Sequence, residues 1–555
     1  MIEIKQRVHG FVSRNETLCL WVFAVLLFTF GIWHQPFINF ETRFAVFAQE
    51  MLRHGPTLFP TTYGQPYPDY PVTSTLLIWL SSLPFGEVTK FSAVLPTALA
   101  SALVVALTYR LLASYAKRWG ALAVGFELLT LMFVAESRSI SIDQMVSAIT
   151  LAAFYLTHQA YREQAALPTK LLWLLLIAGF LIRGPIGIVI PAGVVLSHLM
   201  LTGGRRDVLV FAASSAAILL ACVLAMLGVT LLVYGMDFVL DIIKMQATSR
   251  FGEAADLPRY YYFTSSFGNY ALSYPIAVLV ALGLLFEKLR TRTLGEYAKV
   301  LILLLAWAGI VLLGLSVPQT KKIRYILPAI PPLAALASYA LLNARSPSMK
   351  WIRRCVELVL LLLPLLLAIF SYTQKAKFAD AGLNLTLYLV IFLSIFVVSV
   401  LRAVFLRRHS ADISVPLCLV ACLSVYVFQV GVFEPINSQV HDTNGFVRRI
   451  EALRAERPGE LVFYKENPDG LAIKYLVNAK MDFLPRFISD LDSLKDNPAP
   501  VWLLTKEVNA DELKRAGIDP ELGQYRELFE GVPFVAVYRS ARRAVPAPAA
   551  NALPK

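Results

Sequence analysis

Acidic and basic residues gather where the first long apolar segment of the chain ends. The stretch Asn39–Leu52 carries Glu41, Arg43 and Glu50, and prolines break the stretch Gly64–Pro71 that follows it. A carboxylate held beside a hydroxyl or an amine can act as a general base. A polar, proline-broken loop directly after an apolar helix therefore predicts a reactive site at the boundary between membrane and water.

Further cations lie beside apolar segments elsewhere in the chain. Ionisable groups near a membrane are costly, so they usually line a cavity or pair with another group. Arginine binds phosphate as a bidentate fork and lysine binds it as a point charge. For any single cation, snorkelling or pairing with a nearby carboxylate is the alternative. A lipid phosphate at the outer surface would explain the set as a whole: Arg43, Arg138, Arg183, Arg250, Arg259, Lys321, Lys322 and Arg324.

Carboxylates and tyrosines accompany these cations. Asp143 follows Arg138 by five residues at the start of an apolar segment, where it is a candidate base or a plain helix N-cap. The run Tyr260–Phe263 follows Arg259 and is typical of an aromatic belt at a membrane surface. The functional interpretation is a face that stacks on a sugar or holds a lipid chain. The predicted substrate-lining residues are Asp69, Tyr67, Tyr261 and Tyr325.

Composition shows what must position these residues. The chain has 555 residues, of which 57% are hydrophobic and 16% charged. Soluble domains are closer to a quarter charged, so these values predict a polytopic membrane protein. The five cysteines lie in apolar stretches and form neither a disulfide framework nor a metal motif. No nucleotide-binding, zinc-protease or serine-hydrolase motif occurs, and the net charge of +13 reflects basic loops and no nucleic-acid stripe.

Thirteen apolar segments are long enough to be candidate membrane spans. Arg183-Gly184-Pro185 separates the fifth from the sixth and predicts a turn near the outer surface. The segments are 17–36, 91–112, 119–136, 142–162, 170–184, 186–202, 208–234, 268–286, 299–316, 324–343, 354–373, 383–405 and 413–432.

Alternate loops between these segments are rich in lysine and arginine, beginning with Lys5, Arg7 and Arg14. Cytoplasmic loops carry this excess, so the N-terminus is expected in the cytoplasm as an uncleaved anchor, with the C-terminus outside. We expect a transmembrane domain over 1–433 with outer loops at 37–90 and 237–266. Residues 434–540 alternate between strand-like and helix-like runs, which predicts a small periplasmic α/β domain, and residues 541–555 are expected to be a disordered tail.

In order along the chain, these motifs resemble those of the GT-C membrane glycosyltransferases. The closest pattern is that of the family 39-like branch, which contains protein mannosyltransferases and lipid A aminoarabinose transferases. Its first outer loop has the form Asp-Glu-x-Arg-Tyr-Ala-x-x-x-x-Glu-Met, then Gly-x-x-Tyr, then Lys-Pro-Pro. The matching residues are Glu41, Arg43, Ala45, Glu50, Met51, Gly64, Tyr67 and Pro71.

Later elements match as well. Phe180–Gly187 is similar to the Leu-Thr-Lys-Gly-Pro-x-Gly element with Arg183 in place of its lysine, and Ser316–Pro328 is similar to Ser-x(4)-Lys-x(3)-Tyr-Ile-Leu-Pro. Arg138 with Asp143 resembles the second outer-loop pair, and the region from Arg250 to Tyr262 resembles the loop after the seventh span. Two departures stand out: Phe40 replaces the family aspartate, and Lys-Pro-Pro is reduced to Tyr70-Pro71-Val72.

The resemblance implies the GT-C fold and a polyprenyl-phosphate sugar donor, which is undecaprenyl phosphate in a bacterium. It implies that Glu41 or Asp143 orients or deprotonates the acceptor, and that attack inverts the anomeric carbon. The donor phosphate is expected against cations, which makes a cofactor or metal unnecessary although the carboxylates leave metal binding open. The expected phosphate-binding residues are Arg43, Arg138, Arg183, Arg250, Arg259, Lys321 and Arg324.

The sequence therefore predicts an inner-membrane glycosyltransferase that acts at the periplasmic face. Its acceptor would be a lipid similar to lipid A, a glycan or a protein, and it would need the bilayer but no nucleic acid. Two alternatives stay open. One is a transporter or flippase of a lipid-linked glycan, although transporters tend to carry their charges near mid-bilayer. The other is an inactive relative that binds polyprenyl phosphate as an assembly partner, which the substitution at Phe40 would fit.

Overall fold

The structure is a computed structural model that describes residues 15–33, 35–62, 64–68, 71–251, 257–291, 297–343, 345–409, 412–441, 443–466, 473–479, 485–494, 499–516, 525–529 and 531–540. Within these ranges, the side chains of residues 246–251, 291 and 525–528 are not described. The expected disordered tail at 541–555 lies outside the described residues. Contacts divide the chain into two compact units, which are treated separately below.

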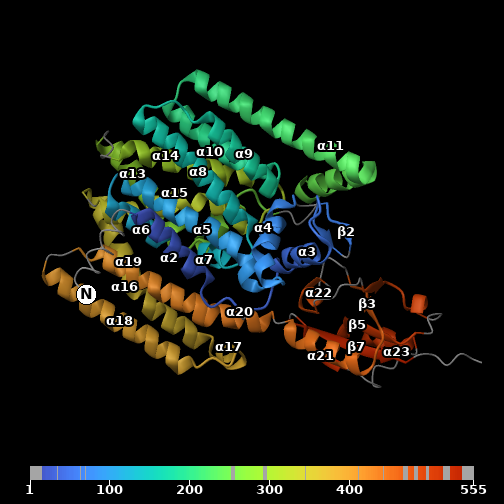
Figure 1. The fold of residues 1–555 in the computed structure, drawn as a ribbon. Coiled ribbons are helices and arrows are strands. Elements are labelled where there is room, and N and C mark those ends of the chain that lie inside the picture. The colour runs from blue at the N-terminus through green and yellow to red at the C-terminus, as the bar shows by residue number, and fades with distance from the viewer. Residues whose placement is uncertain are drawn as a thin grey trace, which may run out of the picture. The chain divides into compact units, whose positions relative to one another are not determined.

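The first unit is a bundle of helices built from the apolar segments (Figure 1). Every one of the thirteen expected segments coincides with a helix or a pair of consecutive helices. The helices are α2 Glu16–Thr29, α4 Thr73–Ser82, α5 Lys90–Ala113, α6 Lys117–Leu129, α7 Leu131–Ser137, α8 Ile142–Glu163, α9 Thr169–Arg183, α10 Ile186–Thr202, α11 Arg205–Phe251, α12 Tyr261–Asn269, α13 Ser273–Thr291, α14 Ala298–Ser316, α15 Ile330–Leu342, α16 Pro347–Thr373, α17 Lys375–Asp380, α18 Leu385–Arg408, α19 Ser414–Phe428 and α20 Glu434–Val440.

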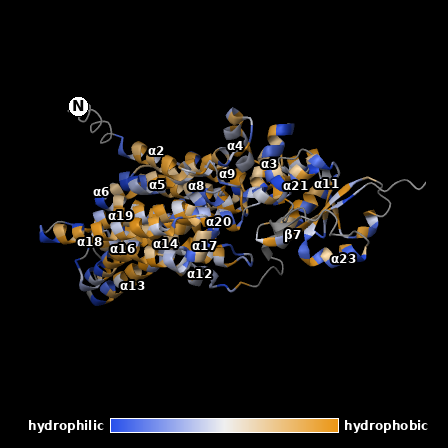
Figure 2. Cartoon of the chain, turned by 90° about the horizontal axis from the view of Figure 1, so that it is seen from below, coloured by the Kyte–Doolittle hydropathy of each residue, from blue (hydrophilic) through white to orange (hydrophobic). Residues whose placement is uncertain are grey.

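The apolar character of these helices confirms a polytopic helical membrane protein. Within the described residues, seven helices are long and apolar enough to cross a membrane, or nine if each of two bent helix pairs is one span. The sequence predicted thirteen spans. Some of the predicted spans, such as α2 and α10, are apolar helices that are too short to be counted here. Hydrophobic residues dominate the helical surfaces (Figure 2), and many large apolar side chains stay exposed, as expected of surfaces that face lipid.

Breaks in the helices bring polar residues to helix ends. The α6–α7 pair bends by 77° and the α12–α13 pair by 117°. Between α9 and α10, Gly184 adopts φ 64° and ψ −147°, which a glycine accepts at little cost, so the turn expected at Arg183-Gly184-Pro185 is present. Gly179 and Gly187 lie so close that a Cβ on Gly179 would fall 2.0 Å from the Gly187 carbonyl oxygen. Close glycine packing of α9 on α10 therefore fixes where the residues of the turn lie.

Three short irregular helices complete the first unit, of which the first is the 3-10 helix η1 at Leu83–Phe85. A 3-10 helix, η2, spans Ile323–Ala329 and leads into α15, and a π-helix, η3, spans Gln429–Phe433 between α19 and α20. π-helices are rare and often mark functional positions.

The second unit combines residues 437–555 with the described parts of 34–55 and 61–65. Its five-stranded sheet has the order β4-β3-β5-β7-β6, in which β3 pairs in parallel with β4 and β5, and β7 pairs antiparallel with β5 and β6. The strands are β3 Glu460–Tyr464, β4 Arg486–Ile488, β5 Val501–Lys506, β6 Tyr525–Phe529 and β7 Val532–Arg539. Helices α21 Asn444–Glu456, α22 Ile473–Ala479 and α23 Ala510–Arg515 accompany the sheet, which agrees with the expected α/β pattern.

Helix α3, Glu41–His54, belongs to this second unit although it precedes the sheet by some four hundred residues. Gln49 donates a hydrogen bond to the Val477 carbonyl of α22 at 3.1 Å.

At the end of β3, Lys465 and then Tyr464 donate hydrogen bonds to Glu512 and hold the pKa of that carboxyl below its usual value.

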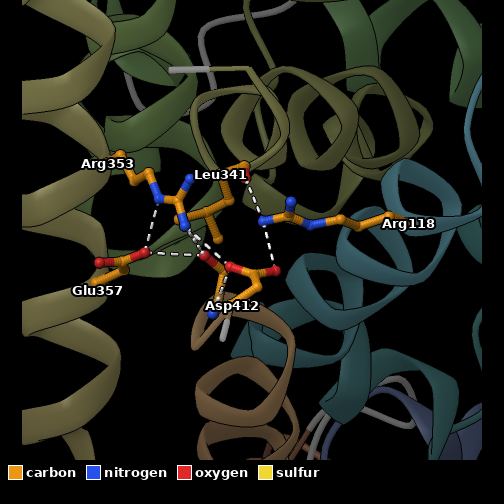
Figure 3. A network of polar contacts seen from close by, with 6 residues as sticks. Arg118, Leu341, Arg353, Glu357 and Asp412 are labelled. Atoms are coloured by element: carbon orange, nitrogen blue, oxygen red, sulfur yellow. Dashed lines mark hydrogen bonds and ion pairs between the residues drawn. The ribbon is translucent and has the colours of Figure 1, made fainter. Parts of the chain in front are cut away.

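A polar network joins four segments of the first unit, at an end that is expected on the cytoplasmic side (Figure 3). Asp412 accepts from Arg118 at 2.7 Å and from Arg353 at 2.9 Å. Arg118 also donates to the Leu341 carbonyl, and Arg353 also pairs with Glu357 at 2.8 Å. One carboxylate thus ties α6 and α16 to the residues before α19.

Replacing Asp412 with alanine should lower the stability of the helix bundle. The substitution leaves two guanidinium groups without their shared partner, and the Asp412 side chain is only 34% exposed. The expected loss is about 1–2 kcal/mol, below the value for a fully buried charged hydrogen bond. Thermal unfolding of the purified protein in detergent measures it. Lys117→Ala is the control, because Lys117 pairs with Glu16 while 72% exposed; an equal loss in both variants would contradict the role of the network.

Candidate active site

Asp143 lies between two arginines from distant parts of the chain. It is in the first turn of α8, Arg183 is the last residue of α9, and Arg324 lies in η2. Arg183 Nη2 is 3.3 Å from Asp143 Oδ1, and Arg324 Nε is 3.2 Å from Asp143 Oδ2. The three side chains are 7%, 7% and 16% exposed. Three of the sequence-predicted site residues are therefore brought together in one buried cluster.

Local hydrogen bonds hold the start of α8 in place. The Ser141 backbone N–H donates to Thr97 Oγ1 at 3.0 Å, and the Gln144 amide donates to the Phe133 carbonyl and to Ser137 Oγ. The N-cap of α8 is Ser141, so Asp143 is not the capping residue. The carboxylate of Asp143 is instead directed to the two guanidinium groups, as an ion-pair role requires.

Tyr325 and Lys321 extend this cluster along the same segment as Arg324. The Arg183 guanidinium lies 5.0 Å from the centre of the Tyr325 ring, within the range of a cation–π contact. Lys321 is 6% exposed, and its ammonium donates to the Leu257 carbonyl at 3.3 Å. A carbonyl oxygen is neutral, so this contact does not cancel the charge of the lysine.

Basic side chains gather near one carboxylate in this part of the first unit. Arg183 and Arg324 both face Asp143, and Lys321 is a buried cation three residues before Arg324 in the chain. Asp143 Oδ2 is buried and accepts no hydrogen bond from the residues that the structure describes, although it faces Arg324. A guanidinium group binds several oxygens of an anion at once, so these arginines are suited to an anion such as phosphate.

Arg138 makes other contacts. It forms a bidentate ion pair with Glu434, at 2.5 Å from Nε to Oε1 and 2.8 Å from Nη2 to Oε2. Its Nη1 donates to the carbonyls of Leu27 and Phe28 at the end of α2. The expected role of Arg138 in phosphate binding stays a prediction, and the geometry favours a different one because the whole guanidinium is engaged within the protein.

The remaining predicted residues of the first unit lie on other elements. Arg259 is exposed in the turn before α12, and Tyr261 is half-buried in the first turn of that helix, with its ring 5.3 Å from Tyr262. Tyr67 is buried, and its backbone N–H donates to the Pro60 carbonyl. Arg250 lies near the end of α11, but its side chain is outside the described residues, as is the whole of Asp69.

The predicted residues of the first loop lie in the second unit. Glu41 begins α3, is 4% exposed, and accepts a hydrogen bond from the Ile38 backbone N–H at 3.3 Å. Glu50 is also buried and accepts from the Gly64 backbone N–H, while Arg43 is half-buried. Phe40, at the position of the family aspartate, packs edge-on against Phe44 at 5.1 Å. The carboxylate of Glu41 thus also closes the turn that leads into α3.

Sequence reasoning did not single out Glu434. The only local signal is that this glutamate follows the last apolar segment of the first unit. The local pattern does not indicate which residue pairs with it. Among the described residues, no group of three or more histidine, cysteine, aspartate or glutamate side chains is placed to hold a metal ion. The expectation that no metal is needed stays a prediction.

Several known proteins are similar to this chain in sequence. Residues 69–234 match the model of the dolichyl-phosphate-mannose-protein mannosyltransferase family. Undecaprenyl phosphate-alpha-4-amino-4-deoxy-L-arabinose arabinosyl transferase of Pseudomonas aeruginosa (strain UCBPP-PA14) is 28% identical over 60% of this chain and 61% of its own length. The protein of that name from Yersinia pestis (strain Pestoides F) is 29% identical over 54% of each chain. The matched region thus spans about three fifths of these relatives or less.

A solved structure shows the same fold over almost the whole chain. ArnT from Cupriavidus metallidurans bound to undecaprenyl phosphate superimposes with a TM-score of 0.69 and 15% identity, and covers 94% of this chain and 97% of its own. Its apo form gives the same score. The order and packing of the helices in both units are therefore those of a known membrane architecture.

Replacing Asp143 with asparagine should destabilise the protein strongly. The substitution keeps the size of the side chain but leaves Arg183 and Arg324 buried without their counter-charge. Breaking a buried ion pair in this way costs on the order of 3 kcal/mol. Thermal unfolding in detergent measures the loss, and Asp237→Asn on the exposed side of α11 is the control. If both variants unfold like the wild type, the ion pairs of Asp143 do not hold the cluster together.

Proposed function

We propose that the chain transfers a sugar from a polyprenyl-phosphate donor to an acceptor at the periplasmic face of the inner membrane. The proposal builds on its membership of the GT-C family of membrane glycosyltransferases. The observation that carries this proposal is the pair of buried arginines, Arg183 and Arg324, that face Asp143, with the buried Lys321 three residues before Arg324 in the chain. Guanidinium and ammonium groups fit the phosphate of a lipid-linked sugar. The loop between α9 and α10 and the segment that leads into α15 supply these cations.

The cations would act on the leaving group. When the bond between the anomeric carbon and the phosphate oxygen breaks, the oxygen keeps the electron pair and the phosphate gains negative charge. Guanidinium and ammonium groups already in position stabilise this charge without reorganisation. The acceptor oxygen or nitrogen forms the new bond from the opposite side, so the anomeric configuration inverts.

The two candidate carboxylates fit different tasks. Both oxygens of Asp143 face a guanidinium, so Asp143 is best suited to fix the orientation of the two arginines. Glu41 is then the better candidate for orienting the acceptor and taking its proton. Because three cations can neutralise the negative charge of the phosphate, the proposal requires no metal ion.

The names of the relatives support the donor class, and the resemblance of the sequence motifs supports the acceptor class. The relatives are named as arabinosyl transferases of undecaprenyl phosphate-linked aminoarabinose, and the solved ArnT is bound to undecaprenyl phosphate. We propose undecaprenyl phosphate as the lipid carrier and a lipid A-like glycolipid as the acceptor, with a glycan or protein as the other acceptor classes. The bias of lysine and arginine among the loops supports a cytoplasmic N-terminus and a periplasmic second unit.

The position of the cluster favours an enzyme over a flippase. Arg183 ends one helix, Asp143 begins another, and Arg324 lies in the short 3-10 helix before α15. Transporters typically place such groups on broken helices near the middle of the bilayer. Helix ends at a membrane boundary instead suit a reaction between a lipid carrier and an acceptor beside it.

The test is transfer by the purified protein in detergent. A radiolabelled mixture of polyprenyl-phosphate sugars and total membrane glycolipids is supplied to the wild type, Lys321→Met, Arg324→Met and Glu41→Ala. Label should move to an acceptor in the wild type, and loss of one stabilising cation should lower the rate on the order of 10²-fold. Lys375→Met is the matched control, since Lys375 is an exposed lysine of α17 on the same expected side.

Three results would count against the proposal. Equal transfer by the wild type and both cation variants would move the site away from the Asp143 cluster. Full activity of Glu41→Ala would remove this glutamate from the mechanism. If no label moves although the folded wild type binds polyprenyl phosphate, the flippase or the inactive binding partner takes the place of the transferase.

A further inference from the structure

Arg138 and Glu434 form an ion pair that is almost fully enclosed in the first unit. The two side chains are 1% and 10% exposed, and the residues are 296 positions apart in the sequence. The guanidinium donates two parallel hydrogen bonds to the carboxylate and a further pair to carbonyls at the end of α2. Such a planar fork fixes direction as well as distance, which a single lysine contact would not.

Neighbouring side chains complete the pair. Tyr426 places its ring 5.9 Å from the Arg138 guanidinium and donates its hydroxyl to the Leu27 carbonyl that Arg138 also contacts. The Gln429 amide donates to Glu434 Oε1 at 3.3 Å. The pair is therefore part of a polar network that joins α7, α2 and the end of α19, inside a region that is otherwise apolar.

One end of this network adjoins the candidate active site along the chain. Arg138 is the C-cap of α7. Only Ser139, Ile140 and Ser141 lie between it and α8, which carries Asp143 in its first turn. Ser141 and Gln144 hold the other side of this connection through Thr97 and Ser137. A movement of Arg138 would shift the start of α8, and with it the carboxylate that orients Arg183 and Arg324.

The other end lies where the chain leaves the helix bundle. Glu434 directly follows the π-helix Gln429–Phe433, and Ile436 is the last residue of the first unit. A π-helix adds a residue to the turn and so rotates the side chains that follow it. The extra residue at this point gives Glu434 its orientation towards Arg138.

We propose that Arg138 and Glu434 form a positioning pair for the sugar transfer: they hold the connection before α8, and so Asp143, in the orientation that the reaction requires. This role rests on the proposed function. It assigns Arg138 to positioning and leaves phosphate binding to the cluster around Asp143, because Glu434 and two backbone carbonyls already take four of the five N–H donors of the Arg138 guanidinium.

The experiment compares kinetics, binding and folding in three variants. Glu434→Gln removes the charge of one partner, Arg138→Lys keeps the charge but loses the fork, and Arg138→Met with Glu434→Leu replaces the pair by apolar side chains of similar volume. Replacing both partners often leaves stability unchanged, so the double variant should unfold near the wild-type temperature. The matched control is Arg353→Met with Glu357→Leu, a second arginine–glutamate pair at the expected cytoplasmic end.

The expected result separates positioning from simple stabilisation. The double variant at 138 and 434 should lose kcat on the order of 10²-fold, the effect of a misplaced catalytic group, while its affinity for polyprenyl phosphate stays that of the wild type. Arg138→Lys should recover part of the lost kcat. The control pair should change neither quantity.

Each other outcome overturns the proposal in a recognisable way. Wild-type kcat in the double variant would make the pair purely structural. Loss of polyprenyl-phosphate binding in the Arg138 variants, with binding kept in Glu434→Gln, would show that Arg138 contacts the phosphate directly. If the wild type transfers no sugar at all, the proposed function fails first and the positioning role fails with it.

Discussion

Charge that is buried at a membrane boundary must be balanced, and this requirement governs how the helix bundle is arranged. Arg183 and Arg324 come from segments about 140 residues apart, yet both face the carboxylate of Asp143. An uncompensated guanidinium in an apolar environment would be strongly unfavourable. Ion pairs with Asp143 therefore hold two segments in place against α8, in addition to apolar packing. These segments are the turn between α9 and α10 and the 3-10 helix before α15.

Three polar networks in the first unit differ in geometry. Arg138 and Glu434 form a bidentate pair, whereas Arg118 and Arg353 share Asp412, and Arg353 also pairs with Glu357 (Figure 3). In the cluster around Asp143, arginines from two separate segments face one carboxylate at 3.3 and 3.2 Å. These contacts are longer than the 2.5 and 2.8 Å of the bidentate pair, so the arginines of this cluster are better suited to bind an incoming anion.

Local patterns in the sequence account for the helices but not for their partners. Apolar runs of about 20 residues locate the helices because a helix in lipid must satisfy its own backbone. Arg183-Gly184-Pro185 is recognisable as a turn because glycine and proline favour it. The pairing of Arg138 with Glu434 is set by tertiary packing over 296 residues, and no periodicity or spacing carries that information. The sequence therefore predicted Arg138 as a phosphate ligand but did not predict its pairing with Glu434.

The first loop shows a second limit of local reasoning. Asn39–Leu52 was expected as part of an outer loop of the membrane domain, and the structure shows an amphipathic helix, α3, that packs with α22 in the second unit. The helix is buried over almost all of Glu41–Met51, with Phe44, Phe47 and Met51 among its buried apolar residues. The same helix fixes Glu41 at its first residue. A carboxylate on a packed helix is more rigidly held than one on a free loop, and a rigid base suits a reaction that depends on orientation.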